Sequence, residues 1–70
     1  METNEKQVSN NIKAQIKKRG YLMGDIANKM GITRQSLSNT INHPFRSNLK
    51  RLVIIAEAIG CNIDEFFLAK

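Results

Sequence analysis

The sequence has few of the residues on which enzymes, metalloproteins and disulfide-linked proteins depend. Its 70 residues include one cysteine, one histidine, one proline and no tryptophan. A single cysteine, Cys61, excludes an internal disulfide, and together with His43 it offers no credible set of metal ligands. Four acidic residues lie beyond the first five positions, and their spacing is not that of paired catalytic carboxylates. We therefore expect no catalysis, no metal and no cofactor.

Long apolar segments are missing as well. No run approaches the roughly 18 apolar residues that would span a bilayer, and the N-terminal METNEKQVSN lacks the apolar region of a signal peptide. The basic residues do not share a helix with an exposed apolar face, which argues against a membrane-surface role. We expect one cytoplasmic domain over residues 1–70, with residues 1–6 frayed and a core of modest size.

Acidic residues are also scarce through most of the chain. Residues 6–51 hold ten Lys or Arg and one acid, Asp25, so this segment carries a net charge of +9, whereas the protein as a whole carries +5. Such a concentration of positive charge is typical of a protein that neutralises phosphates. The alternative interpretation is a solubilising surface, which basic composition alone does not exclude.

What the sequence does contain is a strong local pattern in residues 23–42, MGDIANKMGITRQSLSNTIN. Apolar residues from Met23 to Met30 recur at i, i+3, i+4 and i+7, as on one face of a helix. Gly31 follows where a helix C-terminus favours left-handed backbone. Thr33 is suited to cap a second helix, predicted over residues 34–42. The pattern predicts a helix-turn-helix.

The outer face of the second predicted helix has an unusual composition. Leu37 and Ile41 fall on the inner face, and the outer side carries amides, hydroxyls and one guanidinium but no acid. Nearly opposite the inner residues lie Gln35, Ser38, Asn39 and Asn42, with Arg34 and Ser36 on the flanks. Arg pairs bidentately with guanine and amides pair with adenine in the major groove. The alternative is a polar solvent face that happens to be rich in Asn and Ser.

The flanking residues predict three further helices and no strand. Val8, Ile12 and Ile16 repeat every four residues, and the first helix should end before Gly20. After the loop of residues 43–47, in which we expect Phe45 to fold inward, Asn48 or Ser47 should cap a fourth helix that ends at Gly60. A short fifth helix follows, for which Asn62 and Glu65 resemble a capping box. The sequence thus predicts an all-α, compact five-helix domain.

Apolar residues near the end of the chain exceed what a monomeric core requires. Ile54 lies roughly opposite the apolar stripe of its helix, and Phe67 and Leu68 lie at the C-terminus. Two such sites close together would form a patch for a partner. We predict a homodimer contact through Ile54, Phe67 and Leu68.

From about Ile12 to Phe67, the chain resembles the Cro and phage-repressor class of helix-turn-helix domains, the XRE family. The resemblance rests on Met30-Gly31-Ile32-Thr33, on Leu37-Ser38, on Ile55 to Gly60 and on Ile63 to Phe67. It implies a λ-repressor-like domain that regulates transcription, usually as a dimer on a palindromic operator. It also implies that Arg34, Gln35 and Asn39 face bases, and that Thr33 and Ser36 lie at the DNA backbone or groove wall.

The chain departs from that family at two places. Leu22-Met23 stands where the family often has Thr-Gln, so the family's Gln-to-phosphate contact is missing. Ile16 and Ile41 occupy positions at which many members form a buried Arg–Glu ion pair. We expect an apolar contact between these isoleucines instead, a replacement that is often neutral or stabilising because no charge is desolvated.

The sequence therefore predicts a transcriptional regulator, and specifically a repressor, that binds double-stranded DNA in a sequence-specific manner. Bases would be read by Arg34, Gln35, Ser38 and Asn39. The backbone would be held by Lys29, Thr33, Ser36, Asn42, Arg46, Ser47, Asn48 and Lys50. The alternative is a protein-interaction module, for example an antitoxin-like partner that uses the same fold.

Overall fold

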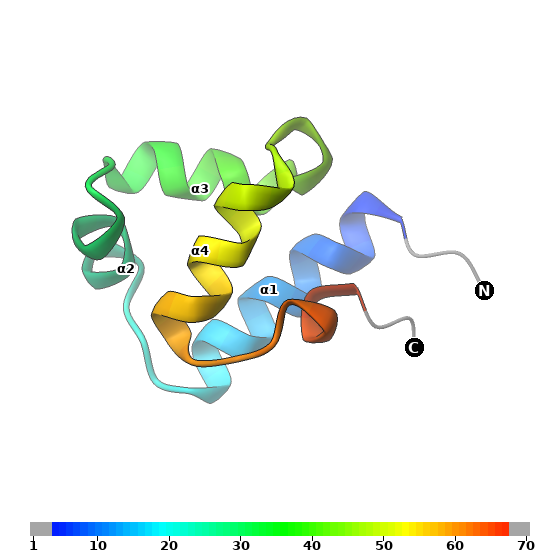
Figure 1. The fold of residues 1–70 in the computed structure, drawn as a ribbon, viewed down its shortest axis with the longest axis horizontal. Helices are drawn as coiled ribbons and strands as arrows, with labels where there is room; N and C mark the ends of the chain where they lie inside the picture. The colour runs from blue at the N-terminus through cyan, green and yellow to red at the C-terminus, as the bar shows by residue number, and fades with distance from the viewer. Residues whose placement is uncertain (1–3, 68–70) are drawn as a thin grey trace.

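The computed structural model describes residues 4–67, and in this range every regular element is helical. In chain order the elements are α1 (Glu5–Lys18), α2 (Met23–Met30), α3 (Arg34–Asn42), the 3₁₀ helix η1 (Pro44–Arg46), α4 (Leu49–Ile59) and the 3₁₀ helix η2 (Ile63–Phe67) (Figure 1). No strand occurs between residues 4 and 67. The all-α prediction is confirmed.

The helix-turn-helix forms with the predicted boundaries. Gly31 closes α2 in the left-handed region at φ 69°, and Ile32 N–H donates to the carbonyl of Ala27 at 3.0 Å. The hydroxyl of Thr33 accepts from the N–H of Ser36 at 3.1 Å and so caps α3. Leu22 stands at the N-cap of α2 and contributes no side-chain hydrogen bond. The turn therefore follows from local capping chemistry.

The first helix begins earlier than the sequence suggested. The side chain of Asn4 accepts from the N–H of Gln7 at 2.8 Å, and α1 starts at Glu5. Residues 1–6 were expected to be frayed, and α1 already begins at Glu5 within that range. The physical reason is an N-cap together with an acid in the first helical turn, where it complements the helix dipole.

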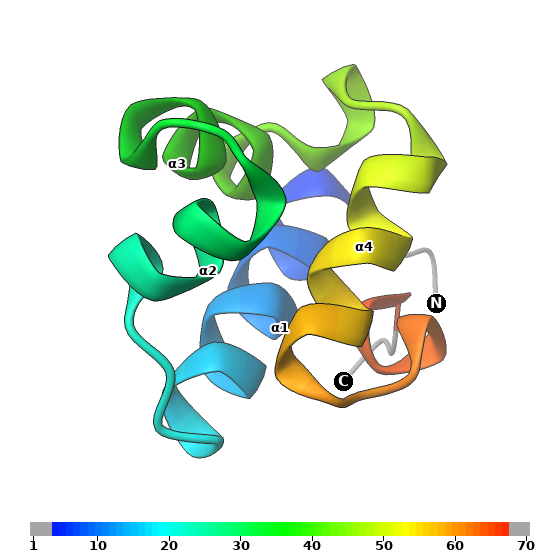
Figure 2. The same ribbon diagram turned by 60° about the vertical axis from the view of Figure 1, so that its left-hand side comes forward.

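The core lies where α1, α2, α3, α4 and η2 meet (Figure 2). Each of these five elements contributes apolar side chains, and the buried hydrophobic residues are Val8, Ile12, Ile16, Ile26, Ala27, Leu37, Ile41, Leu52, Ile55, Ala56, Ile59 and Phe66. Ile16 and Ile41 both belong to this cluster; the contact between them stays a prediction. Leu49, which periodicity places on the apolar stripe of α4, is 61% exposed. Burial of α3 along one stripe leaves its other side free.

The fifth predicted α-helix is a 3₁₀ helix, so the five-helix count is wrong. Glu65 N–H donates to the backbone carbonyl of Asn62 at 3.0 Å, an i to i+3 bond. The short segment is held by packing, because Phe66 is fully buried and its carbonyl accepts from Asn11 Nδ2 at 3.0 Å. Long-range contacts with α1, and not an intrinsic helical tendency, define this element.

The loop between α3 and α4 also differs from the prediction. Phe45, expected to fold inward, is 55% exposed, and the neighbouring Pro44 is buried instead. Both residues belong to η1, in which successive side chains point about 120° apart at three residues per turn. Only one of the two can face the core. The N–H of Phe45 donates to Glu5 Oε2 at 3.3 Å, which ties η1 to the start of α1.

Candidate nucleic-acid interface

The polar face of α3 lies on the outside of the molecule. In Figure 1, α3 runs along one edge of the domain, and its inner residues Leu37 and Ile41 are buried in the core. Arg34, Gln35, Asn39 and Asn42 are exposed and Ser38 is half-buried. Because no acid occurs on α3, this face offers amide, hydroxyl and guanidinium groups to a ligand.

Side chains one helical turn apart pair on this face. Gln35 Nε2 donates to Asn39 Oδ1 at 3.2 Å, and Asn42 Nδ2 donates to Ser38 Oγ at 3.4 Å. The first pair leaves the carbonyl oxygen of Gln35 and the amino group of Asn39 for an outside partner. One acceptor beside one donor group complements the N6 amino group and N7 of adenine in the major groove.

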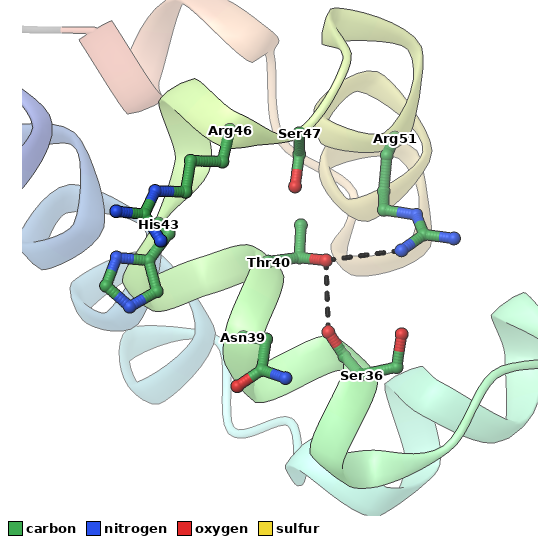
Figure 3. Close-up of a pocket in the computed structure, with 7 residues that line it drawn as sticks. All are labelled: Ser36, Asn39, Thr40, His43, Arg46, Ser47 and Arg51. Carbon is green, nitrogen blue, oxygen red and sulfur yellow. Dashed lines mark hydrogen bonds between the residues drawn. The ribbon is translucent and has the colours of Figure 1, made fainter.

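A pocket of ≈ 490 Å³ adjoins this face, between α3, η1 and the start of α4 (Figure 3). Its lining residues are Ser36, Asn39, Thr40, His43, Arg46, Ser47 and Arg51. In Figure 3, Arg46 and His43 lie on one side of the pocket and Arg51 on the other. A second hollow of ≈ 320 Å³ is lined by Arg46, Ser47, Asn48 and Arg51. Hydroxyls and guanidinium groups facing one space form a suitable environment for a phosphate group.

The start of α4 adds a positive end to this pocket. Asn48 caps the helix by accepting from the N–H of Arg51 at 2.9 Å. The first N–H groups of a helix carry partial positive charge and bind anions. Arg46 and Arg51 line the smaller hollow with Asn48, and Lys50 belongs to the first turn of α4. Residues 43–51 include no acid, and the carboxylate of Glu5 accepts from the N–H of Phe45 at 3.3 Å. Because three cations outnumber this one carboxylate, the local charge favours an anion.

The pattern that defines the winged helix-turn-helix DNA-binding family matches residues 8–68 of this chain. The chain belongs to that family. Comparison with curated proteins and with solved structures gave no match. The family shown is a helix-turn-helix DNA-binding family, as predicted, and it is not specifically the Cro and phage-repressor family. Residues 4–67 contain no strand, so a β-hairpin wing is not formed in that range.

In this winged helix-turn-helix domain, the predicted DNA-contacting residues divide into two groups. Ser36, Asn39, Arg46 and Ser47 meet around the larger pocket, and Asn48 lines the smaller one. The other predicted contacts belong to neither of these two linings; they are Lys29, Thr33, Arg34, Gln35, Ser38, Asn42 and Lys50. Lys29 is exposed on α2, with its ammonium 5.5 Å from the centre of the Tyr21 ring.

Three residues that line the larger pocket were not among the predicted DNA contacts. Thr40, His43 and Arg51 line the pocket together with the predicted residues. The basic cluster around Lys50 pointed to Arg51, but no sequence signal distinguished Thr40, which is 3% exposed and lies on the inner side of α3. Its position depends on how α3 packs against α4.

Of the predicted dimer residues, Ile54 lies in the middle of α4 and Phe67 is the last residue of η2. Ile54 is 38% exposed, whereas Phe67 is half-buried and packs against the core. Leu68 lies outside the described residues. The domain therefore presents Ile54 to solvent on the α4 surface.

The only cysteine has the environment of a packing residue. Cys61 is half-buried next to the core, and burial raises the pKa of its thiol, with Glu65 adding to this effect and Arg19 opposing it. A raised pKa decreases the fraction of reactive thiolate.

Among the described residues, no group of three or more His, Cys, Asp or Glu side chains is arranged to hold a metal ion. Within the same range, no helix has both the length and the apolar character needed to cross a bilayer.

Proposed function

We propose that this protein is a sequence-specific transcriptional regulator that inserts α3 into the DNA major groove. The observation that carries the proposal is the exposed, acid-free face of α3 directly beside a pocket lined by arginines and hydroxyls. Amide and guanidinium groups discriminate base edges, and the neighbouring cations bind phosphates. The proposal assigns the protein no catalytic step.

On this proposal, different residues on the outer face of α3 recognise different bases. Arg34, at the N-terminal end of α3, contacts guanine through O6 and N7. Gln35 and Asn39, already paired at 3.2 Å, read adenine as a unit, and Ser38 contacts a neighbouring base. The first turn of the recognition helix is the part that reaches base edges in helix-turn-helix proteins.

The remaining polar residues hold the DNA backbone. Arg46, Ser47, Asn48 and Lys50 surround the start of α4, where helix N–H groups favour a phosphate. Thr33, Ser36 and Asn42 follow the groove wall along α3, and Lys29 contacts a phosphate from α2. These contacts set the register of α3 and supply most of the salt-dependent affinity.

We further propose a homodimer that represses transcription from a palindromic operator, the arrangement implied by the resemblance to Cro and phage repressors. The exposed Ile54 supports a contact between copies on the α4 side. Sedimentation of the wild type and of Ile54→Asp tests this point. A dimer that dissociates in the variant is expected, and a wild type that stays monomeric on its operator contradicts the dimer.

Selection from a random duplex library, followed by binding of the enriched duplex across a salt series, tests the proposed function. We expect a two-fold motif with half-sites about 10 bp apart. Lys50→Ala should weaken binding to all duplexes. Lys13→Ala is the matched control, because Lys13 is also exposed but belongs to α1, and not to α3 or the start of α4. Failure to enrich any sequence, with only weak salt-sensitive binding, would overturn the base-reading role.

A protein-interaction module is the second candidate function. The observation in its favour is the exposure of large apolar side chains on α4, with Leu49 at 61% and Ile54 at 38%. On this alternative, the selection experiment enriches no duplex, and Ile54→Asp abolishes binding to a partner protein.

A further inference from the structure

A buried hydroxyl on the inner side of α3 joins the recognition helix to α4. Thr40 Oγ1 donates to the backbone carbonyl of Ser36 at 3.0 Å and accepts from Arg51 Nη1 at 3.4 Å (Figure 3). Thr40 is 3% exposed, whereas Arg51 is half-buried and lines both hollows. One polar side chain thus spans the junction between the two helices.

Packing alone does not require a hydroxyl at this position. The neighbouring inward residues of α3, Leu37 and Ile41, are apolar and almost fully buried. A threonine that bonds to the carbonyl four residues earlier contributes little to helix stability and often slightly disfavours it. The bond to Ser36 does, however, fix the direction of the Thr40 hydroxyl hydrogen. An oxygen lone pair is thereby left to face Arg51.

The bond to Thr40 holds the guanidinium of Arg51 beside the pocket. A guanidinium has five N–H donors in a rigid planar fork, and one of them is directed at Thr40. The others remain for an anion in the pocket between α3 and α4. The side chain of Arg is flexible, and ordering it on binding costs free energy. That cost is smaller when the side chain is already held in place before the ligand binds.

We propose that Thr40 is a positioning residue that holds the guanidinium of Arg51 ready for a DNA phosphate at the junction of α3 and α4. Arg51 makes the contact, and Thr40 acts through Arg51. Because Thr40 belongs to the recognition helix, the phosphate contact and the depth of α3 in the groove are set together. This inference rests on the proposed DNA-binding function.

A double-mutant cycle on the enriched duplex tests the inference. Thr40→Val removes the hydroxyl and keeps the shape, and we expect it to weaken binding by about three- to tenfold, the effect of leaving one long side chain to be ordered on binding. Arg51→Ala should weaken binding further and reduce the salt slope by about 1. In the Arg51→Ala background, Thr40→Val should have no additional effect on affinity. Thr40→Ser, which keeps the hydroxyl, should bind as the wild type does.

The cycle separates positioning from a purely structural role. Thermal melts of each variant give the stability change, and a structural defect would weaken binding by the same factor with or without Arg51. Equal factors in the two backgrounds would overturn the inference and leave DNA binding intact. If the wild type binds no duplex, the proposed function fails and this inference with it. Thr40→Ala, which also removes the hydroxyl, provides the same comparison should valine disturb the packing.

Discussion

Replacement of Leu37 by alanine should show how strongly the recognition helix depends on its buried stripe. Leu37 is fully buried at the centre of α3, whereas Leu49, at the start of α4, is 61% exposed. The two substitutions remove the same atoms from the chain. Any difference between them therefore reports the environment and not the chemistry of the side chain.

The expected magnitude follows from burial and chain length. Leu37→Ala should cost about 2–5 kcal/mol, the range for a fully buried leucine that leaves a cavity. A domain of 70 residues has a free energy of unfolding of about 3.5–10 kcal/mol. A loss of 3 kcal/mol within that range lowers Tm by about 12–24 °C in a domain this small. Leu49→Ala should change stability by about 0.5 kcal/mol or less.

Urea unfolding of both variants, followed by circular dichroism, provides the measurement. We expect a lower midpoint for Leu37→Ala with an unchanged m-value, since the surface exposed on unfolding is nearly the same. If the two variants lose equal stability, Leu37 does not anchor α3 to the core, and the assignment of inner and outer faces to the recognition helix is refuted.

Four further predictions concern recognition, packing and the thiol. Arg34→Ala should cost about 1–3 kcal/mol of binding free energy at one base position; equal weakening on every duplex would contradict base reading. Lys50→Ala should weaken binding to all duplexes and reduce the salt slope by about 1, and an unchanged slope would remove it from the backbone contacts. Ile16→Arg should destabilise the fold by about 3–5 kcal/mol as an uncompensated buried charge, and adding Ile41→Glu should recover part of the loss; additive effects in thermal melts would rule out their pairing. Burial raises the pKa of the Cys61 thiol, so its alkylation rate should rise at higher pH in the native chain than in urea, and a native midpoint at or below the unfolded one would contradict this.

The helix-turn-helix could be predicted from the sequence to the residue because its determinants are local. The left-handed Gly31 and the Thr33 cap act within one helical turn of their own positions. The apolar periodicity of α2 and α3 likewise depends on spacing along one helix. The outer face of α3 followed from the same periodicity, and its exposed residues are those predicted to face DNA.

Other features depended on contacts between residues far apart in the chain. The 3₁₀ form of η2 is stabilised by burial of Phe66 and by its bond with Asn11, 55 residues away. The side chain of Phe45 points outward, and the backbone N–H of the same residue donates to the carboxylate of Glu5 on α1. No periodicity in residues 43–47 contains that information, because the deciding partner lies on another helix.

The sequence by itself determined the helical class, the limits of α2 and α3 and the acid-free face of α3, because capping and periodicity act over a few residues. Only the tertiary structure decided that Thr40 and Arg51, eleven residues apart, meet at 3.4 Å. It also decided which arginines and hydroxyls share one pocket. Those arrangements depend on how α3, η1 and α4 pack around the common core, and packing is a property of the whole fold.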